Sequence, residues 1–381
     1  MTRALTGRRT RIRFRRSPHL VAYWRAGSLV ILNYATRTPA TADPFVCSIL
    51  DFCNEWRTHA QIASGLPAAD PELLPVLLDK LVELSLLVRS DPSGDSRMTA
   101  MQTLDAWNPE AGFFHAATKD VRFLSRSRGR SFDWRNPKSS PMPAPIKRYR
   151  GAPHVALPAP AAQGPFTDVL LARRTSRRYS SLPVSLADLS SVLGFGAGVQ
   201  QWASTPTGEV ALKTSPSGGA RHSIECYVVV RNIDGLRAGI YHYRPDRHFL
   251  ERIGGAVPIE RMRSYVPGSE YFASASAMVF FTAVFEREIW RYPYARAYRA
   301  IIAEAGHVCQ TFLLTATSLG LASYCVMGIA DSIIEADLGI DGITEPVLYC
   351  AGVARPPRGT AAATLPRGSV KTRPNRYLRP R

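Results

Sequence analysis

The stretch SPSGGARHSIECYVVV, residues 215–230, decides how the larger part of this chain is interpreted. Its second half alternates apolar residues in the manner of a strand, with Ile224, Tyr227 and Val229 among them. Its first half is a turn that contains two adjacent glycines. Paired glycines are tolerated where a backbone bends sharply or approaches something flat or charged. The turn therefore predicts a loop that faces a ligand and leads into a strand.

The segments around this stretch predict alternating helices and strands. A box of Ser185 and Asp188 opens a helix over 186–195, and Gly320 ends a long apolar-faced helix over 299–319. Other helices are expected over 166–173 and from 332, and strands over 239–243, 247–253, 277–284, 323–328 and 346–353. This order favours an α+β fold with a central sheet.

The first quarter of the chain has a different pattern. Two short strands over 19–36 surround a turn at Ala26 and Gly27. Helices near 43–54, 58–64 and 71–87 follow, and Leu87 to Arg89 closes the segment as a strand. Such a unit resembles a winged-helix module. It offers no nucleophile, metal cluster or phosphate loop, so its expected role is binding or scaffolding.

The chain divides into five parts on composition. Between residues 126 and 165 it carries eight prolines and several arginines, which excludes a helix or a central strand there. The predicted parts are a basic disordered arm at 1–18, a winged-helix-like domain at 19–95, a Pro/Arg-rich linker or strap at 96–163, a larger domain at 164–357 and a basic tail at 358–381.

The formal net charge of +18 is carried mainly by arginine. Much of it lies in the two terminal segments and the linker, and no zinc finger, RNA-binding signature or clean basic helix face accompanies it. A phosphate-bearing cofactor or an acidic substrate is therefore favoured over nucleic acid. The six cysteines form no CxxC pair, which favours reduced core thiols in a cytoplasmic protein. No apolar stretch reaches transmembrane length.

The cluster RRTSRRY, residues 173–179, offers four guanidiniums and the two aliphatic hydroxyls of Thr175 and Ser176 at a helix end. Guanidiniums match phosphate oxygens bidentately, and hydroxyls complete such a shell. A solvated basic helix end would show the same pattern. His222 and His307 stand alone and are expected to be structural. What favours phosphate binding is the order RRTSRRY, SPSGGARHSIECYVVV, GIYHY, RAYRAIIAEAGHVCQTFLLTATSLGLASYCVMGI and VLYCAGVARP.

In this order the motifs resemble the nitroreductase-like flavoenzymes, and within them the SagB-type dehydrogenases, which include azoline oxidases of thiazole- and oxazole-modified peptides. The resemblance covers residues 164–357. It implies an FMN-binding homodimer with a central mixed sheet, surrounding helices and flavins at the subunit interface. The segment before it resembles the peptide-binding elements that accompany such enzymes.

Position by position, the resemblance implies cofactor-binding residues. Phosphate and ribityl contacts fall on Arg173, Arg174 and Thr175, and a closing basic position falls on Arg355. A cation at the pyrimidine edge of the ring falls on Arg177. The loop that passes the ring falls on Ser217, Gly218 and Gly219, and the strand end that lines it falls on Met327 and Gly328. A flat ring needs backbone nearby without Cβ atoms, which the glycines provide.

The resemblance also implies a Lys-Tyr pair for proton abstraction, and here the chain departs from it. The corresponding stretch is WRYPYARAYR, with Arg291 and Tyr292 nearest in position. Arginine stays protonated and is a poor general base, although it can orient a carbonyl. Tyr292, Tyr294 and Tyr298 remain candidates for proton transfer.

The expected function is an FMN-dependent dehydrogenation of a peptide, azoline to azole, with a cyclodehydratase as a possible partner. A base would remove the proton α to the carbonyl, the flavin would accept the β-hydride, and O2 would reoxidise the flavin. Two alternatives stay open: a small-molecule oxidoreductase that uses NAD(P)H, and a non-catalytic scaffold that presents a peptide. The N-terminal domain either binds a leader peptide or is a stabilising appendage.

Overall fold

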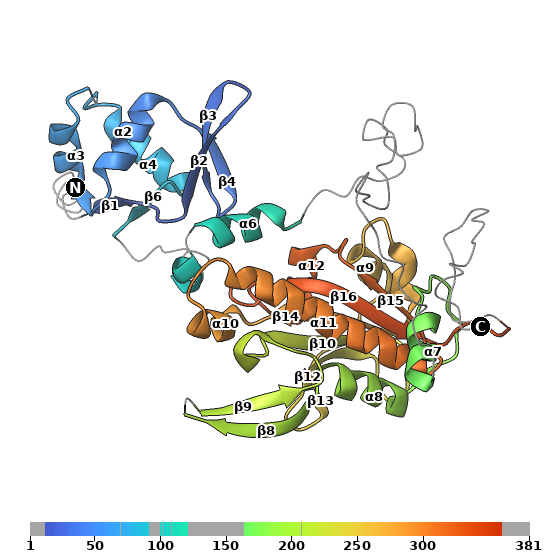
Figure 1. Ribbon diagram of the computed structural model, residues 1–381. Coiled ribbons are helices and arrows are strands. Elements are labelled where there is room, and N and C mark those ends of the chain that lie inside the picture. The colour runs from blue at the N-terminus through green and yellow to red at the C-terminus, as the bar shows by residue number, and fades with distance from the viewer. Residues whose placement is uncertain are drawn as a thin grey trace, which may run out of the picture.

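A computed structural model describes residues 12–90, 100–120 and 164–359, except positions 69, 101, 108 and 207. It contains a small N-terminal domain and a larger α+β domain built on one sheet (Figure 1). The α+β class expected from the sequence is confirmed. Within the described residues, no helix has the length and apolar character needed to span a bilayer.

The larger domain is organised by a six-stranded sheet. Its order is β13 (Phe249–Gly254), β12 (Gly239–Arg244), β10 (Ile224–Val230), β14 (Ala277–Ala283), β16 (Val347–Ala354) and β15 (Ala322–Val326). All five pairings between these neighbours are antiparallel, so the expected mixed sheet is an antiparallel one within the chain. Two of these pairings are local, because β12 follows β10, and β13 follows β12, through short connections that reverse the chain.

The central strands are buried on both faces, which explains the apolar run after the paired glycines. Every residue of β10 and β14 is buried. Cys226 and Val228 face α8 (Leu186–Ala197) and α11 (Ala297–Ser318), whereas Tyr227 and Val229 face the opposite layer. That layer consists of α9 (Ile259–Ser264), η3 (Glu270–Ser274) and α12 (Asp331–Leu338) (Figure 1).

The N-terminal domain has two small sheets and three described helices. They are β1 (Arg13–Arg16), β5 (Arg57–Thr58) and β6 (Leu87–Arg89); β2 (Leu20–Arg25), β3 (Ser28–Asn33) and β4 (Thr38–Thr41); and α2 (Pro44–Phe52), α3 (His59–Gly65) and α4 (Leu74–Glu83). The prediction of a disordered arm over residues 1–18 is wrong for 13–16. Phe14 is buried in this core, and at Phe14 strand β1 pairs with both β5 and β6. Residues 1–11 lie outside the described part.

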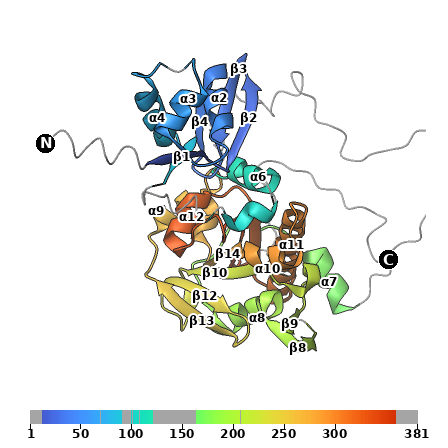
Figure 2. The ribbon, with the colours of Figure 1, turned by 90° about the vertical axis from the view of Figure 1, so that its left-hand side faces the viewer.

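The segment expected as a linker at 96–163 contains ordered structure in its first third. η1 (Gln102–Trp107) and α6 (Glu110–Thr118) form there because Trp107 packs against Phe285 with ring centroids 4.9 Å apart. In both views α6 lies between the N-terminal domain and the larger domain (Figures 1 and 2). The linker expectation is therefore wrong for 102–118, whereas the proline-rich part at 121–163 lies outside the described residues.

Several smaller elements complete the chain. They are α7 (Pro165–Ala172), β7 (Val184–Ser185), β8 (Val199–Thr205), β9 (Gly208–Lys213), η2 (Gly218–Ala220), β11 (Ile233–Asp234) and α10 (Phe285–Arg291). The β8–β9 hairpin, which the sequence did not predict, pairs only with itself among the described strands and extends from the body (Figure 1).

Candidate functional site

The loop at Ser217 to Gly219 is held by a buried network. The Ser217 hydroxyl donates to Oε2 of Glu304 at 2.7 Å and accepts from the backbone N–H of His222 at 2.8 Å. Gly219 has φ of +55°, a conformation that favours glycine. The loop is therefore fixed in shape, and its hydroxyl is already engaged within the protomer.

The paired glycines permit a close approach to α10. A Cβ at Gly218 would lie 2.5 Å from Oε1 of Glu288. One at Gly219 would lie 3.0 Å from the Tyr292 hydroxyl and 3.2 Å from Cγ of Arg291. Within one protomer the glycines thus make room for side chains at the end of α10. The structure brings the predicted glycine loop together with two predicted catalytic residues.

Behind this loop lie two buried carboxyl groups that the sequence analysis missed. Glu288 and Glu304 are both buried, and within the described residues neither oxygen of Glu288 has a hydrogen-bond partner of good geometry. Burial, followed by the charge of Glu304, raises the pKa of Glu288 to about 7, against smaller opposing effects of Ser223 and Arg221. Burial also raises the pKa of Glu304. The sequence did contain a signal for Glu304, because this residue interrupts the apolar face of α11.

The predicted phosphate residues run beside β15. The backbone N–H of Ser176 donates to the carbonyl oxygen of Ser323 at 2.8 Å. This bond places the preceding residues, Arg173, Arg174 and Thr175, along this edge strand. Arg174 donates to two backbone carbonyls, and among the described residues the ion pair of this region involves Arg355 rather than Arg173 or Arg174. Within the part of the chain that the structure describes, the guanidiniums of Arg173 and Arg174 thus have no carboxylate partner.

Two other predicted cations are placed differently. The Arg355 guanidinium donates to Oδ2 of Asp188 at 2.7 Å, so an internal carboxylate already engages it. Its carbonyl accepts from Ser180 at 2.9 Å, so its backbone still borders the arginine segment. Arg177 is half-buried in the same segment. Arg177 thus stays in the same chain segment as Arg173, whereas the Arg355 guanidinium is engaged by Asp188.

Met327 and Gly328 follow the end of β15. A hydrogen bond with the Cys309 thiol, then Tyr349 and the Arg173 guanidinium, lowers the pKa of Cys325 and places Arg173 beside this strand. Two or three residues separate Cys325 from Met327 and Gly328, which is about 7–10 Å at the rise of a strand. Arg173 thus lies beside the end of β15 that Met327 and Gly328 follow.

A cavity of about 560 Å³ opens beside Met327. Ile302, Ala305 and Gly306 of α11 form one wall, and α6 forms another. An added Cβ at Gly306 would meet no atom within 4 Å, so the helix presents a flat, open face. The cavity is within the size range of sites for cofactors and small molecules.

The three candidate tyrosines occupy different places. Tyr292 and Tyr294 lie close together after α10, with ring centroids 6.0 Å apart, and Tyr294 is exposed. Tyr298 is buried at the start of α11, lines the cavity and contacts His115 at 3.1 Å. Burial raises the pKa of Tyr298, so its phenol stays protonated and is not a ready base.

The predicted site residues therefore form two groups within one protomer. Arg291, Tyr292 and the glycine loop lie near the start of α11, whereas α7 and the arginine segment lie beside its far end (Figure 1). Met327 and Tyr298 line the cavity. Across the described ranges, no group of three or more His, Cys, Asp or Glu side chains is placed to hold a metal ion.

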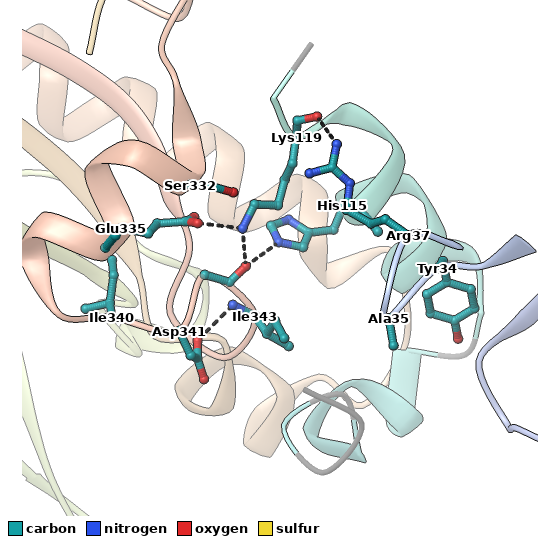
Figure 3. A pocket seen from close by; sticks show the side chains of 13 residues that line it. Tyr34, Ala35, Arg37, His115, Lys119, Ser332, Glu335, Ile340, Asp341 and Ile343 are labelled. Atoms are coloured by element: carbon teal, nitrogen blue, oxygen red, sulfur yellow. Dashed lines mark hydrogen bonds and ion pairs between the residues drawn. The ribbon is translucent and has the colours of Figure 1, made fainter. Parts of the chain in front are cut away.

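A second, smaller cavity of about 190 Å³ lies where the N-terminal domain meets α6 and α12 (Figure 3). Lys119 donates to Glu335 at 2.6 Å and to the Gly342 carbonyl at 2.7 Å, and Arg37 donates to Oδ2 of Asp120 at 2.6 Å. These charged side chains are engaged with one another. The geometry is that of a joint between domains rather than of a binding site.

Comparison with known proteins assigns the family. The nitroreductase family profile matches residues 170–354. The protein MJ1384 of Methanocaldococcus jannaschii, which bears the name nitroreductase, is 36% identical over 173 residues, or 45% of this chain and 83% of that protein. The chain belongs to the nitroreductase family. The expected family is thereby confirmed, whereas the SagB-type assignment stays a prediction.

A second relative has a peptide-related name. The trifolitoxin-processing protein TfxB of Rhizobium leguminosarum bv. trifolii is 37% identical over 154 residues. That match covers 39% of this chain and 41% of TfxB, so this chain spans less than half of that relative.

One solved structure supports the fold, and a second is similar over part of the chain. A chain of the E. coli microcin synthetase McbBCD complex with truncated pro-MccB17 bound matches with a TM-score of 0.51 and 18% identity, over 70% of this chain and 100% of that chain. A nitroreductase from Desulfovibrio desulfuricans in complex with FMN matches with a TM-score of 0.37 and 15% identity, over 56% of this chain and 99% of that chain.

Proposed function

We propose that this nitroreductase-family protein is an FMN-dependent, SagB-type oxidoreductase that dehydrogenates a peptide, converting an azoline ring to an azole. The observation that carries the proposal is the arrangement along β15. Arg173 and Arg174, which have no carboxylate partner among the described residues, run beside this strand, and Met327 and Gly328 follow its end, beside an open cavity of about 560 Å³.

The residues present fit FMN. Arg173 and Arg174 would hold its single terminal phosphate, with Thr175 completing the shell. Arg177 would face the pyrimidine edge, and Gly306 leaves the helix face open to a flat group. FMN, when bound, supplies a two-electron acceptor next to the substrate.

A second copy of the chain would complete the site. The glycine loop lies with Arg291 and Tyr292, apart from the arginine segment, so one protomer does not unite them. In a homodimer, the loop of one copy would cover the cavity of the other. Arg291 would then orient a substrate carbonyl, and Tyr292 or Tyr294 would handle the proton.

A peptide substrate is favoured by the relatives. One is named for trifolitoxin processing, and one solved complex contains the peptide pro-MccB17. We therefore propose a modified peptide as substrate and a cyclodehydratase as partner. The azoline ring would lose one hydrogen as a proton to the protein and the other, with its electron pair, as a hydride, for which FMN, when bound, would supply the two-electron acceptor.

The experiment is to purify the protein, identify its cofactor by chromatography, and incubate it in air with a thiazoline-bearing peptide. A yellow protein with FMN and a product lighter by two hydrogen atoms are expected. The matched thiazolidine peptide, which is not an azoline, serves as control. NAD(P)H consumption without peptide oxidation would favour a small-molecule reductase instead. A colourless protein that FMN does not reconstitute would favour a scaffold.

A further inference from the structure

One wall of the cavity of about 560 Å³ beside Met327 is formed by residues that lie outside the region matched by the nitroreductase family profile. That match begins at residue 170, whereas α6 ends at Thr118. Nevertheless Phe114, His115 and Thr118 line the cavity. This wall is thus added by the segment between the two domains.

His115 fixes the orientation of a neighbouring hydroxyl. Its Nε2 lies 3.0 Å from the carbonyl oxygen of Gly342, which only accepts, so Nε2 carries the ring proton. Burial lowers the pKa of His115 to about 4, so the ring stays neutral and Nδ1 is an acceptor. The Tyr298 hydroxyl lies 3.1 Å from Nδ1 and therefore donates its proton to His115.

The Tyr298 hydroxyl oxygen is therefore a hydrogen-bond acceptor at this wall. The only proton of the Tyr298 hydroxyl is committed, so its oxygen can only accept from a group in the cavity. Phe114 lies edge-on to the Tyr298 ring, with centroids 5.7 Å apart, and makes the wall apolar and aromatic. Two charged residues that also line the cavity are engaged, because Lys119 donates to Glu335 and Asp331 accepts from the Asp120 N–H.

We propose that this wall binds the amide next to the substrate's planar ring, with the amide N–H donating to the Tyr298 oxygen and the ring against Phe114. His115 is then a positioning residue, which acts through Tyr298. The inference rests on the proposed function and names the part of the substrate that the cavity recognises.

The test uses two small probes, thiazole-4-(N-methylcarboxamide), which has one N–H, and its N,N-dimethyl analogue, which has none. Their dissociation constants are measured by calorimetry on the FMN-loaded protein. The wild type should prefer the N–H probe by about three- to tenfold, the value of one neutral hydrogen bond. Tyr298→Phe should abolish this preference, because it removes the acceptor.

The matched pair at position 115 tests the positioning role. In His115→Gln the amide can accept from Tyr298 and donate to Gly342, so the preference should remain. In His115→Leu the hydroxyl is free to turn, so the preference should fall. Circular dichroism spectra show that each variant is folded, and FMN affinity should be unchanged in all of them.

Three results would overturn the inference: a preference that survives Tyr298→Phe, equal behaviour of the two His115 variants, or binding of neither probe by the wild type. A loss of FMN affinity in Tyr298→Phe would also overturn it, by assigning the hydroxyl to the cofactor. Failure of the proposed function would be recognised by a different measurement, the uptake of FMN. A protein that takes up no FMN defeats that function, while calorimetry on the same protein still measures the N–H preference.

Discussion

At the scale of single residues, Glu288 is held in surroundings that oppose its charge. Its carboxyl is buried, lacks a partner of good geometry among the described residues, and faces a second carboxyl on Glu304. Its pKa of about 7 in the fold exceeds the ordinary value of 4.5, so the folded state holds a proton that the unfolded state has lost between these two pH values. Stability therefore falls as pH rises from about 4.5 to 7.

Glu288→Gln should remove much of this dependence, because the amide mimics the protonated carboxyl. The wild type should lose on the order of 2–3 kcal/mol of unfolding free energy between pH 5 and 8 through this residue. Urea unfolding at both pH values measures it. Glu286→Gln changes an exposed carboxylate of the same helix and should leave the loss intact. Identical pH dependence in Glu288→Gln and wild type would show that Glu288 is ionised in the fold.

Arg173 tests the phosphate assignment at the same scale. Arg173→Ala should weaken FMN binding by about 2–4 kcal/mol, as for the truncation of one partner of a buried charge pair. Fluorescence titration of the cofactor-free protein with FMN measures the change. Arg178→Ala removes an exposed guanidinium from the same segment and should have a much smaller effect. Equal losses in the two variants would indicate general attraction rather than a defined contact.

At the scale of elements, substitution of Gly306 should change the stability of α11 and ligand binding in opposite directions. Glycine inside a helix is less favourable than other residues by about 1 kcal/mol, and nothing lies within 4 Å of an added Cβ. Gly306→Leu should therefore raise the melting temperature while it fills the cavity and lowers FMN or probe binding. Ala303→Leu adds the same side chain to an exposed position that does not line the cavity. Unchanged binding in Gly306→Leu would place the ligand elsewhere.

The edge strand β2 is the second element that makes a prediction. It borders a groove of about 560 Å³, lined by Leu20 and Ala22 on one side and by Leu50 of α2 on the other. An extended peptide can add to such an edge, and Arg15 and Arg16 at the groove favour an acidic one. If the domain binds a leader peptide, Ala22→Trp should weaken binding of the full-length precursor and leave FMN binding and short substrates unaffected.

Thr41→Trp, on the opposite edge strand β4, is the matched control. These substitutions are sharper than removal of residues 1–95, because Tyr34 and Ala35 belong to the core of the larger domain and deletion would expose that core. Unchanged precursor binding in Ala22→Trp would assign recognition to the larger domain or to a partner protein.

Elements with strong local patterns were predictable, and those fixed by distant contacts were not. The strands β10 and β14 and the helix α11 follow apolar runs, and Gly320 with φ of +68° ends α11 as expected. By contrast, η1 and α6 depend on Phe285 and Tyr298, which lie more than 160 residues further along the chain. Local composition carries no trace of such partners.

The same contrast applies to the candidate site. The glycine loop and the arginine segment could be found because their motifs occur in a characteristic order. His115 could not, since a single histidine before a proline-rich stretch gives no sign that Gly342 and Tyr298 will fix its tautomer. A joint role of the glycine loop and the arginine segment stays a prediction, and only the whole fold relates the positions of these two segments around α11.

At the scale of the whole molecule, the separation of these groups and the exposed apolar surface point to one arrangement. Phe166 and Leu170 of α7 are 68% and 44% exposed, and Phe195 of α8 is 56% exposed. Both helices contact α11, and large exposed apolar side chains are typical of an interaction surface where they lie together. A two-fold axis would bury the same patch on both copies and complete two sites at once.

We therefore expect a homodimer by multi-angle light scattering, with one FMN per chain. Phe166→Glu combined with Leu170→Glu should place four like charges at the interface of a dimer, and should yield a monomer that has lost most of its FMN. Trp24→Glu combined with Val76→Glu makes the same chemical change at exposed positions of the N-terminal domain, 74% and 69% exposed, and should remain dimeric and yellow. Because the cofactor is read by absorbance and the mass by scattering, assembly and flavin binding are measured independently. A wild-type monomer with full FMN occupancy would show that one chain forms a complete FMN site. The glycine loop would then only make room for the side chains at the end of α10.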